Sequence, residues 1–118
     1  MRYVISLLLA VAALAMAGSA AAAPGVVRPV TLTIYVGKHG VVGGPKKFTV
    51  HRNAHVLLVV HSAIGKAVHL HGYDIEKPIR SRTVPVRMAF VARQTGQFEV
   101  EVHITESLGI RIALLTVK

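Results

Sequence analysis

The sequence contains no cysteine at any of its 118 positions. This absence excludes disulfide cross-links, and it excludes a lipoprotein anchored through a lipidated cysteine. Acidic residues are also scarce, with 5 Asp and Glu against 14 Lys and Arg, for a formal net charge of +9. Such an excess attracts anionic surfaces and polymers through long-range forces that salt weakens. The basic residues are scattered, which is typical of a solvated surface and indicates no specific nucleic-acid site.

The longest apolar run lies at the N-terminus and has the features of a secretory signal peptide. Arg2 supplies the positive start, a long apolar stretch follows, and the alanines at 20–23 offer small-residue cleavage positions. We expect cleavage after Ala22, because cleavage one residue later would place a proline directly after the cut. A membrane anchor needs about 20 apolar residues, and this run ends instead in small residues and proline. Residues 1–22 therefore predict export to the periplasm or secretion, with no transmembrane segment left after cleavage.

The remaining chain is short enough for one domain with a single core. We expect residues 23–29 to be a linker and residues 30–118 to be the domain, which keeps a net charge of +8 once Arg2 is removed. No amphipathic helix of useful length follows the leader. Turn signals separate seven or eight short strands at near-regular spacing, which predicts an all-β, antiparallel Greek-key β-sandwich. The expected strands are 30–36, 48–52, 55–61, 67–71, 75–80, 86–92, 97–105 and 110–117.

The most distinctive motif is VHLHGYD at residues 68–74, an apolar run with two histidines separated by one residue. Successive side chains of a β-strand point to opposite faces, so His69 and His71 share one face while Val68 and Leu70 occupy the other. Two imidazoles on one face of a strand offer two nitrogen ligands to a metal ion. The motif is short, and a polar strand face that happens to contain histidine explains it equally well.

Two separated blocks resemble the cupredoxin-like family, and in particular small secreted bacterial members that lack the copper-ligand cysteine. The first block is HLHGYD at 69–74, and the second runs from FVA at 90–92 to FEVEVH at 98–103, before LTV at 115–117. The likeness covers about residues 30–118. It implies a cupredoxin-like β-sandwich, in agreement with the strand pattern.

The resemblance also shows what this chain lacks as a copper protein. Family members place one histidine after the fourth strand, and a cysteine, a second histidine and usually a methionine on or after the penultimate strand. The cysteine position falls at about Val102, and no histidine or methionine follows Glu106. A blue-copper centre needs the thiolate that sets its redox properties. Electron transfer of that kind is therefore excluded.

His69, His71 and His103 form the best candidate metal site. In a cupredoxin-like fold, we expect the strand ends that carry them to meet at one pole of the sandwich. Three imidazoles suit Cu(II), and less well Zn(II), with water or a carboxylate such as Glu101 or Asp74 as a further ligand. Because imidazoles bind metal in the neutral form, protons should compete below about pH 6. The alternative is that His103 is simply solvated on a polar face.

The other candidate residues have structural explanations. His55 and His61 are six strand residues apart, about 20 Å, and cannot share an ion. His51 could approach His55 across a turn, but a surface position is the simpler interpretation. Met88 alternates with apolar residues, as a core side chain does. Tyr73 is explained by turn packing, with its hydroxyl bonded to the backbone.

These observations predict a secreted or periplasmic protein that binds a divalent metal ion, copper before zinc, for storage, delivery or sensing. The alternative is a metal-free β-sandwich whose basic surface holds an anionic envelope component or a partner protein. No catalytic residue is assigned, because Ser62 and Ser107 lack a nucleophile-elbow context and no glycine-rich phosphate loop precedes a helix. We therefore expect a protein that is not an enzyme.

Overall fold

Residues 27–118, the part of the chain that the computed structural model describes, form nine β-strands and no helix. The predicted all-β fold is confirmed. The predicted signal peptide at 1–22 and the start of the predicted linker, 23–26, lie outside the described residues. Within the described part, no helix has the length and hydropathy needed to span a membrane.

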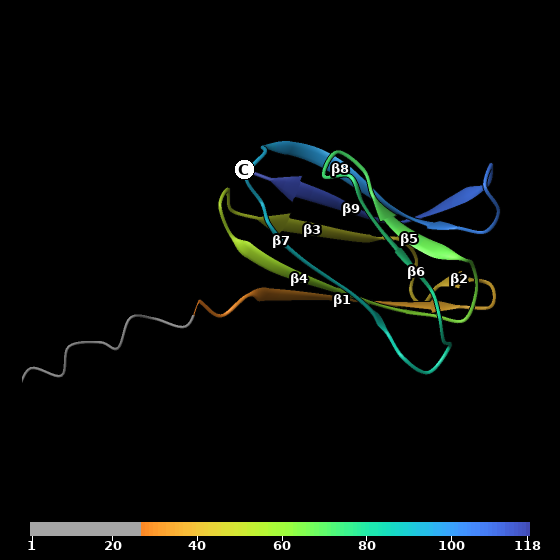
Figure 1. Cartoon of the computed structure of the whole chain (residues 1–118). Helices are drawn as coiled ribbons and strands as arrows, with labels where there is room; N and C mark the ends of the chain where they lie inside the picture. The colour runs from red at the N-terminus through yellow and green to blue at the C-terminus, as the bar shows by residue number, and fades with distance from the viewer. Residues whose placement is uncertain (1–26) are drawn as a thin grey trace, which may run out of the picture.

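The strands pack as two sheets facing each other across one core (Figure 1). The first sheet has the order β2-β1-β4-β7 and the second has the order β3-β9-β8-β5-β6. The strands are β1 (Val30–Gly37), β2 (Gly40–Val41), β3 (Lys46–Val50), β4 (His55–Ser62), β5 (Ala67–Leu70), β6 (Ile75–Pro78), β7 (Val86–Val91), β8 (Gly96–His103) and β9 (Gly109–Val117). This arrangement is a β-sandwich, as the sequence predicted.

Both sheets are mixed rather than wholly antiparallel. β1 runs parallel to β4, and β3 runs parallel to β9, while all other neighbouring strands are antiparallel. The reason is that the chain leaves the first sheet after β2, forms β3 in the second sheet, and returns as β4 beside β1. Strands that neighbour each other after such a crossing can share a direction, which a two-residue hairpin never allows.

The observed strands agree with the expected ones except in the glycine-rich segment 37–47, where no strand was expected. There, the two residues of β2 pair with Val36 and Gly37 of β1. Gly40, with φ +115, supplies the backbone conformation for this tight reversal. β6 contains Pro78, which lacks the backbone N–H that an interior strand would need, and it lies at the edge of its sheet.

The apolar alternation within each strand builds the core. Val68 and Leu70 of β5 are fully buried, and so are Val102 of β8 and Met88 of β7. The alternate residues of β5 and β8 consequently face away from the core, on the outer face of the second sheet. Met88 is a core residue, as predicted.

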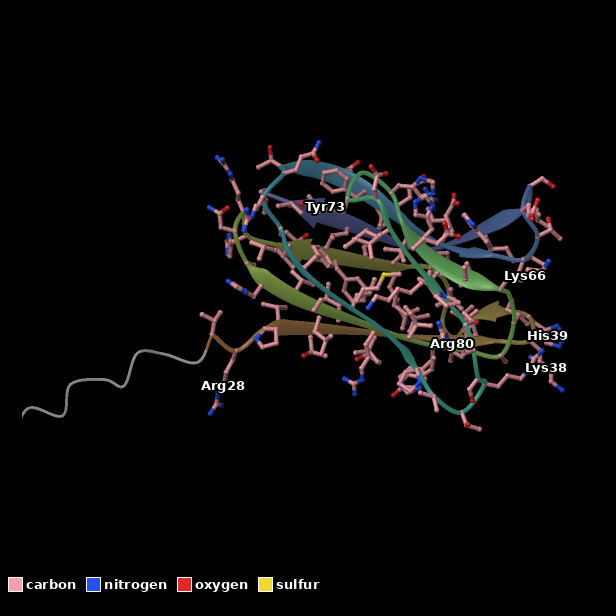
Figure 2. All side chains as sticks on the ribbon, viewed as in Figure 1. Arg28, Lys38, His39, Lys66, Tyr73 and Arg80 are labelled. Atoms are coloured by element: carbon pink, nitrogen blue, oxygen red, sulfur yellow. The ribbon has the colours of Figure 1, made fainter. Side chains whose placement is uncertain are left out.

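Tyr73 fixes the loop that follows β5. Its hydroxyl donates a hydrogen bond to the Gln94 carbonyl (2.7 Å) and accepts one from the Gln94 amide (3.1 Å). Its ring packs against Phe90 and Phe98, with centroids 5.1 and 4.8 Å away. Figure 2 shows Tyr73 in this loop, beside the start of β8. The predicted packing role of Tyr73 is confirmed, and it holds the end of the VHLHGYD motif in place.

Candidate metal centre

Cross-strand register brings the histidines of β5 and β8 together. β5 lies between β6 and β8, and His69 stands opposite Glu76 on one side and Glu101 on the other. His103 pairs with Ala67, and so lies diagonally across from His69 on the same face. The structure therefore gathers His69, His71 and His103 on one surface, as the sequence predicted.

The cluster lies on the outer face of the five-stranded sheet rather than at a pole of the sandwich. His69 is paired on both sides within the sheet, and its chain neighbours Val68 and Leu70 point into the core. Because β5 and β8 are antiparallel, the last residue of β8 comes beside the first residue of β5. The histidines therefore do not meet at a pole of the sandwich, as expected, but lie across two adjacent strands on a sheet face.

The three imidazoles are close enough to share one ion. Each offers one ring nitrogen, and these nitrogens all lie within 4.8 Å of one another. The His69 ring centroid is 4.2 Å from that of His71 and 5.2 Å from that of His103. Among the described residues, no other set of three or more His, Asp and Glu side chains has ligand atoms so placed.

Two ring nitrogens of this cluster are buried. Within the described part of the chain, His69 Nδ1 has no hydrogen-bond partner, and His71 Nε2 has only the Glu101 carboxylate beside it, at 2.9 Å. Buried polar atoms are nearly always paired in folded proteins, because an unpaired one costs about 1–3 kcal/mol. The unpaired His69 Nδ1, converging with two further imidazoles, fits a metal ion that would accept its lone pair.

Two carboxylates border the cluster. Glu101 Oε2 lies 2.9 Å from His71 Nε2 and 3.5 Å from His103 Nε2. Glu76 Oε1 lies 3.4 Å from the other nitrogen of His103, Nδ1. Of the two carboxylates that the sequence offered as further ligands, Glu101 is therefore in place, whereas Asp74 is exposed in the turn.

The surroundings of Glu101 favour its charged form. The neighbouring His71 imidazole lowers the pKa of the Glu101 carboxyl below its ordinary value of 4.5. Partial burial acts in the opposite direction without cancelling this effect, and His103 adds a smaller lowering. Glu101 is thus a carboxylate at neutral pH, which is the form that binds metal.

Sequence reasoning missed Gly109, which makes room for Glu101. Gly109 pairs with His103 at the start of β9. A Cβ at position 109 would lie 2.7 Å from Glu101 Oε2 and 3.4 Å from His103 Cδ2. A glycine within a strand often marks such a close approach, but the sequence alone does not say which side chain approaches.

The remaining histidines lie apart from the cluster. His51 and His55 are exposed, as predicted. His61 stacks on Tyr35, with ring centroids 4.6 Å apart and an angle of 11° between the planes. Val102, at the expected cysteine position of the family, is fully buried in the core.

Comparison with known proteins shows a similarity of fold. No family model and no curated protein matches the chain. A copper binding protein, whose solution structure is of the apo form, matches with a TM-score of 0.55 and 11% sequence identity, over 75% of this chain and 86% of that one. A chain of a heme-copper terminal oxidase dimer matches with a TM-score of 0.50 and 14% identity, over 75% of this chain and 64% of that one.

The shared feature is the β-sandwich. At 11% and 14% identity, these likenesses establish the architecture and carry no assignment of function. They agree with the cupredoxin-like resemblance of the sequence at the level of fold.

Proposed function

We propose that the protein binds a divalent metal ion, copper(II) first and zinc(II) second, through His69, His71 and His103. The observation that carries the proposal is the convergence of three imidazole nitrogens within 4.8 Å of one another, among side chains that include a buried His69 nitrogen with no hydrogen-bond partner in the described part of the chain. Imidazole is a preferred ligand of both ions. The fold likeness to a copper binding protein supports copper as the first choice.

The role that fits this site is storage, delivery or sensing of the metal in the periplasm or outside the cell. The chain has no thiolate to build an electron-transfer copper centre. The cluster lies on an open sheet face, with the His71 side chain 43% exposed, so a metal ion can reach it from solvent. We propose a binding protein rather than an enzyme.

Metal titration of the untagged protein tests the proposal. The wild type should bind one Cu(II) or Zn(II), and the His69→Ala/His71→Ala variant should bind at least 100-fold more weakly, since two of three ligands are gone. The His51→Ala/His55→Ala variant is the matched control, because it removes two exposed histidines elsewhere and should bind like the wild type. Equal affinity in all three proteins would remove the proposed site.

A second candidate function rests on a basic hollow at the edge of the sandwich. The connection between β6 and β7 borders a cavity of about 420 Å³. Lys77, Arg80 and Arg87 line it, together with Val84, which is 66% exposed. Within residues 27–118, none of these three cations forms a salt bridge. Figure 2 shows Arg80 on this connection, which crosses from one sheet to the other.

Unpaired cations around an apolar side chain suit an anionic lipid surface of the cell envelope, and we propose this as the second function. Vesicles of anionic lipid should bind the protein, with affinity that falls steeply as salt rises and that ignores chelators. A Lys77→Gln/Arg80→Gln/Arg87→Gln variant should bind more weakly than a variant with three exposed cations changed elsewhere, Lys38→Gln/Lys47→Gln/Arg52→Gln. Equal binding to zwitterionic vesicles would contradict it.

A further inference from the structure

One carboxylate oxygen of Glu101 faces two of the three histidines. Glu101 Oε2 lies 2.9 Å from His71 Nε2 and 3.5 Å from His103 Nε2, so the same oxygen that contacts a protonated ring in the metal-free protein can share an ion with the neutral rings. Ligand atoms around a tetrahedral ion with bonds of about 2.05 Å lie about 3.3 Å from one another. The distances of 2.9 and 3.5 Å from this oxygen to His71 and His103 bracket that spacing.

The backbone keeps space for this carboxylate. Glu101 stands opposite His69 in the register, and its side chain is 21% exposed. Any side chain at Gly109 would enter the volume that its carboxylate occupies. Because Gly109 has no positive φ to explain a glycine there, the close approach of Glu101 and His103 is the structural use of this residue.

Glu76 supports the site from the other side of His103. It faces Nδ1 of the ring at 3.4 Å, whereas Glu101 faces Nε2. A carboxylate beside one ring nitrogen favours the tautomer that has its proton on that nitrogen, which leaves the other nitrogen for metal. Glu76 is therefore placed to support His103 as a ligand, while Glu101 lies on the side of His103 that would face the ion.

We infer that Glu101 is the fourth ligand of a three-histidine, one-carboxylate site, and that its charge makes the site select divalent ions over Cu(I). The inference rests on the proposed metal binding. A carboxylate is a hard, anionic ligand that favours Cu(II) and Zn(II), whereas Cu(I) prefers thiolate and thioether ligands. The cargo of the site is therefore the oxidised copper ion or zinc, and Glu76 is a positioning residue.

The deciding experiment compares Cu(II) and Cu(I) binding by Glu101→Gln, with Glu99→Gln as the matched control. Glu99 lies two residues away on the same strand face and pairs with Arg111 at 3.2 Å, outside the cluster. Glu101→Gln should weaken Cu(II) binding at least 10-fold and change the Cu(II) electron paramagnetic resonance spectrum, while Cu(I) binding changes less than 3-fold. Glu99→Gln should match the wild type for both ions.

The outcomes distinguish failure of the Glu101 inference from failure of the proposed metal binding. Wild-type Cu(II) affinity and spectrum in Glu101→Gln would overturn the inference and leave three-histidine binding intact. Equal losses for Cu(II) and Cu(I) would overturn the claimed selectivity. Failure of the wild type to bind Cu(II) or Zn(II) would defeat the proposed function itself.

A second variant should displace the Glu101 carboxylate without changing its chemistry. Gly109→Ala places a Cβ 2.7 Å from Glu101 Oε2, the far end of a side chain that can move aside. Cu(II) binding should weaken several-fold while the melting temperature of the metal-free protein changes little. Unchanged Cu(II) affinity in Gly109→Ala would count against a defined carboxylate position. Glu76→Gln should give a smaller loss of Cu(II) affinity, with the spectrum retained, as expected for a positioning residue.

Discussion

The charge of Glu101 affects the stability of the fold, and this effect can be measured in the metal-free protein. Its pKa is lowered in the folded protein, first by His71, so the unfolded chain binds the proton more tightly than the folded chain does. The stabilisation is therefore complete above the ordinary pKa of 4.5 and is lost as the pH falls below it, through the lowered folded value.

We predict that the metal-free wild type loses more stability between pH 5 and pH 3 than Glu101→Gln does. Urea unfolding at several pH values gives the free energy of unfolding of each protein. Glu99→Gln serves as the reference, because Glu99 pairs with an arginine rather than with the histidine cluster. If the free energies of unfolding of the wild type and Glu101→Gln change with pH in parallel, Glu101 is not the group responsible.

At the scale of single residues, the sequence predicts that the three histidines meet, but it does not predict which residues surround them. The shared face of His69 and His71 follows from strand alternation alone, and their meeting with His103 was inferred from the fold resemblance. The roles of Glu76 and Gly109 depend on which residues stand opposite each other on neighbouring strands. That register is a long-range property, fixed by the whole sheet, and the local pattern does not contain it.

The element that positions the site is the turn after β5. Gly72 has a φ of +80, and a Cβ there would collide with the ring of Phe98, a core residue. The same turn carries His71 and Tyr73, and the Tyr73 hydroxyl is hydrogen-bonded to the Gln94 backbone. The turn is thus fixed by a glycine that lies against the Phe98 ring and by the anchored Tyr73.

We predict that Gly72→Ala destabilises the protein by about 2–4 kcal/mol, because it combines backbone strain with a clash in the core. Gly44→Ala is the control, since Gly44 has nearly the same φ, +83, with nothing within 4 Å of its added Cβ. It should cost about 1 kcal/mol, the backbone part alone. Chemical unfolding of the metal-free proteins measures both, and equal losses would show that the Phe98 contact is unimportant.

The strands themselves were largely predictable, but their arrangement was not. Val100 and Val102 alternate with Glu99 and Glu101, and β8 contains this run with its apolar residues buried. The parallel pairing of β1 with β4 arises because β3 joins the opposite sheet. No local pattern in β1 records that crossing. The sequence did not predict the two-residue β2, because the glycines in and around it favour a loop.

The whole molecule separates its charges between two surfaces. Glu76, Glu99 and Glu101, three of the five acidic residues of the chain, lie on the strands around the histidines. Lys77, Arg80 and Arg87 line the hollow at the β6–β7 edge instead. The histidine cluster is therefore locally acidic on a protein that is basic overall, which attracts cations to the cluster and anions to the edge.

We predict that metal binding stabilises the entire fold in a pH-dependent way. The cluster joins β5 to β8, which are central in the second sheet, and binding to the folded state alone adds about 2.7 kcal/mol at a free metal concentration 100 times Kd. For a domain of this size, that corresponds to a rise in Tm on the order of 10 °C. Because the imidazoles must be neutral to bind, the rise at pH 7.5 should disappear at pH 5. Calorimetry with and without Zn(II) measures it, and His69→Ala/His71→Ala should show no rise at either pH. An equal rise at both pH values, or in the variant, would mean that zinc stabilises the protein somewhere other than this cluster.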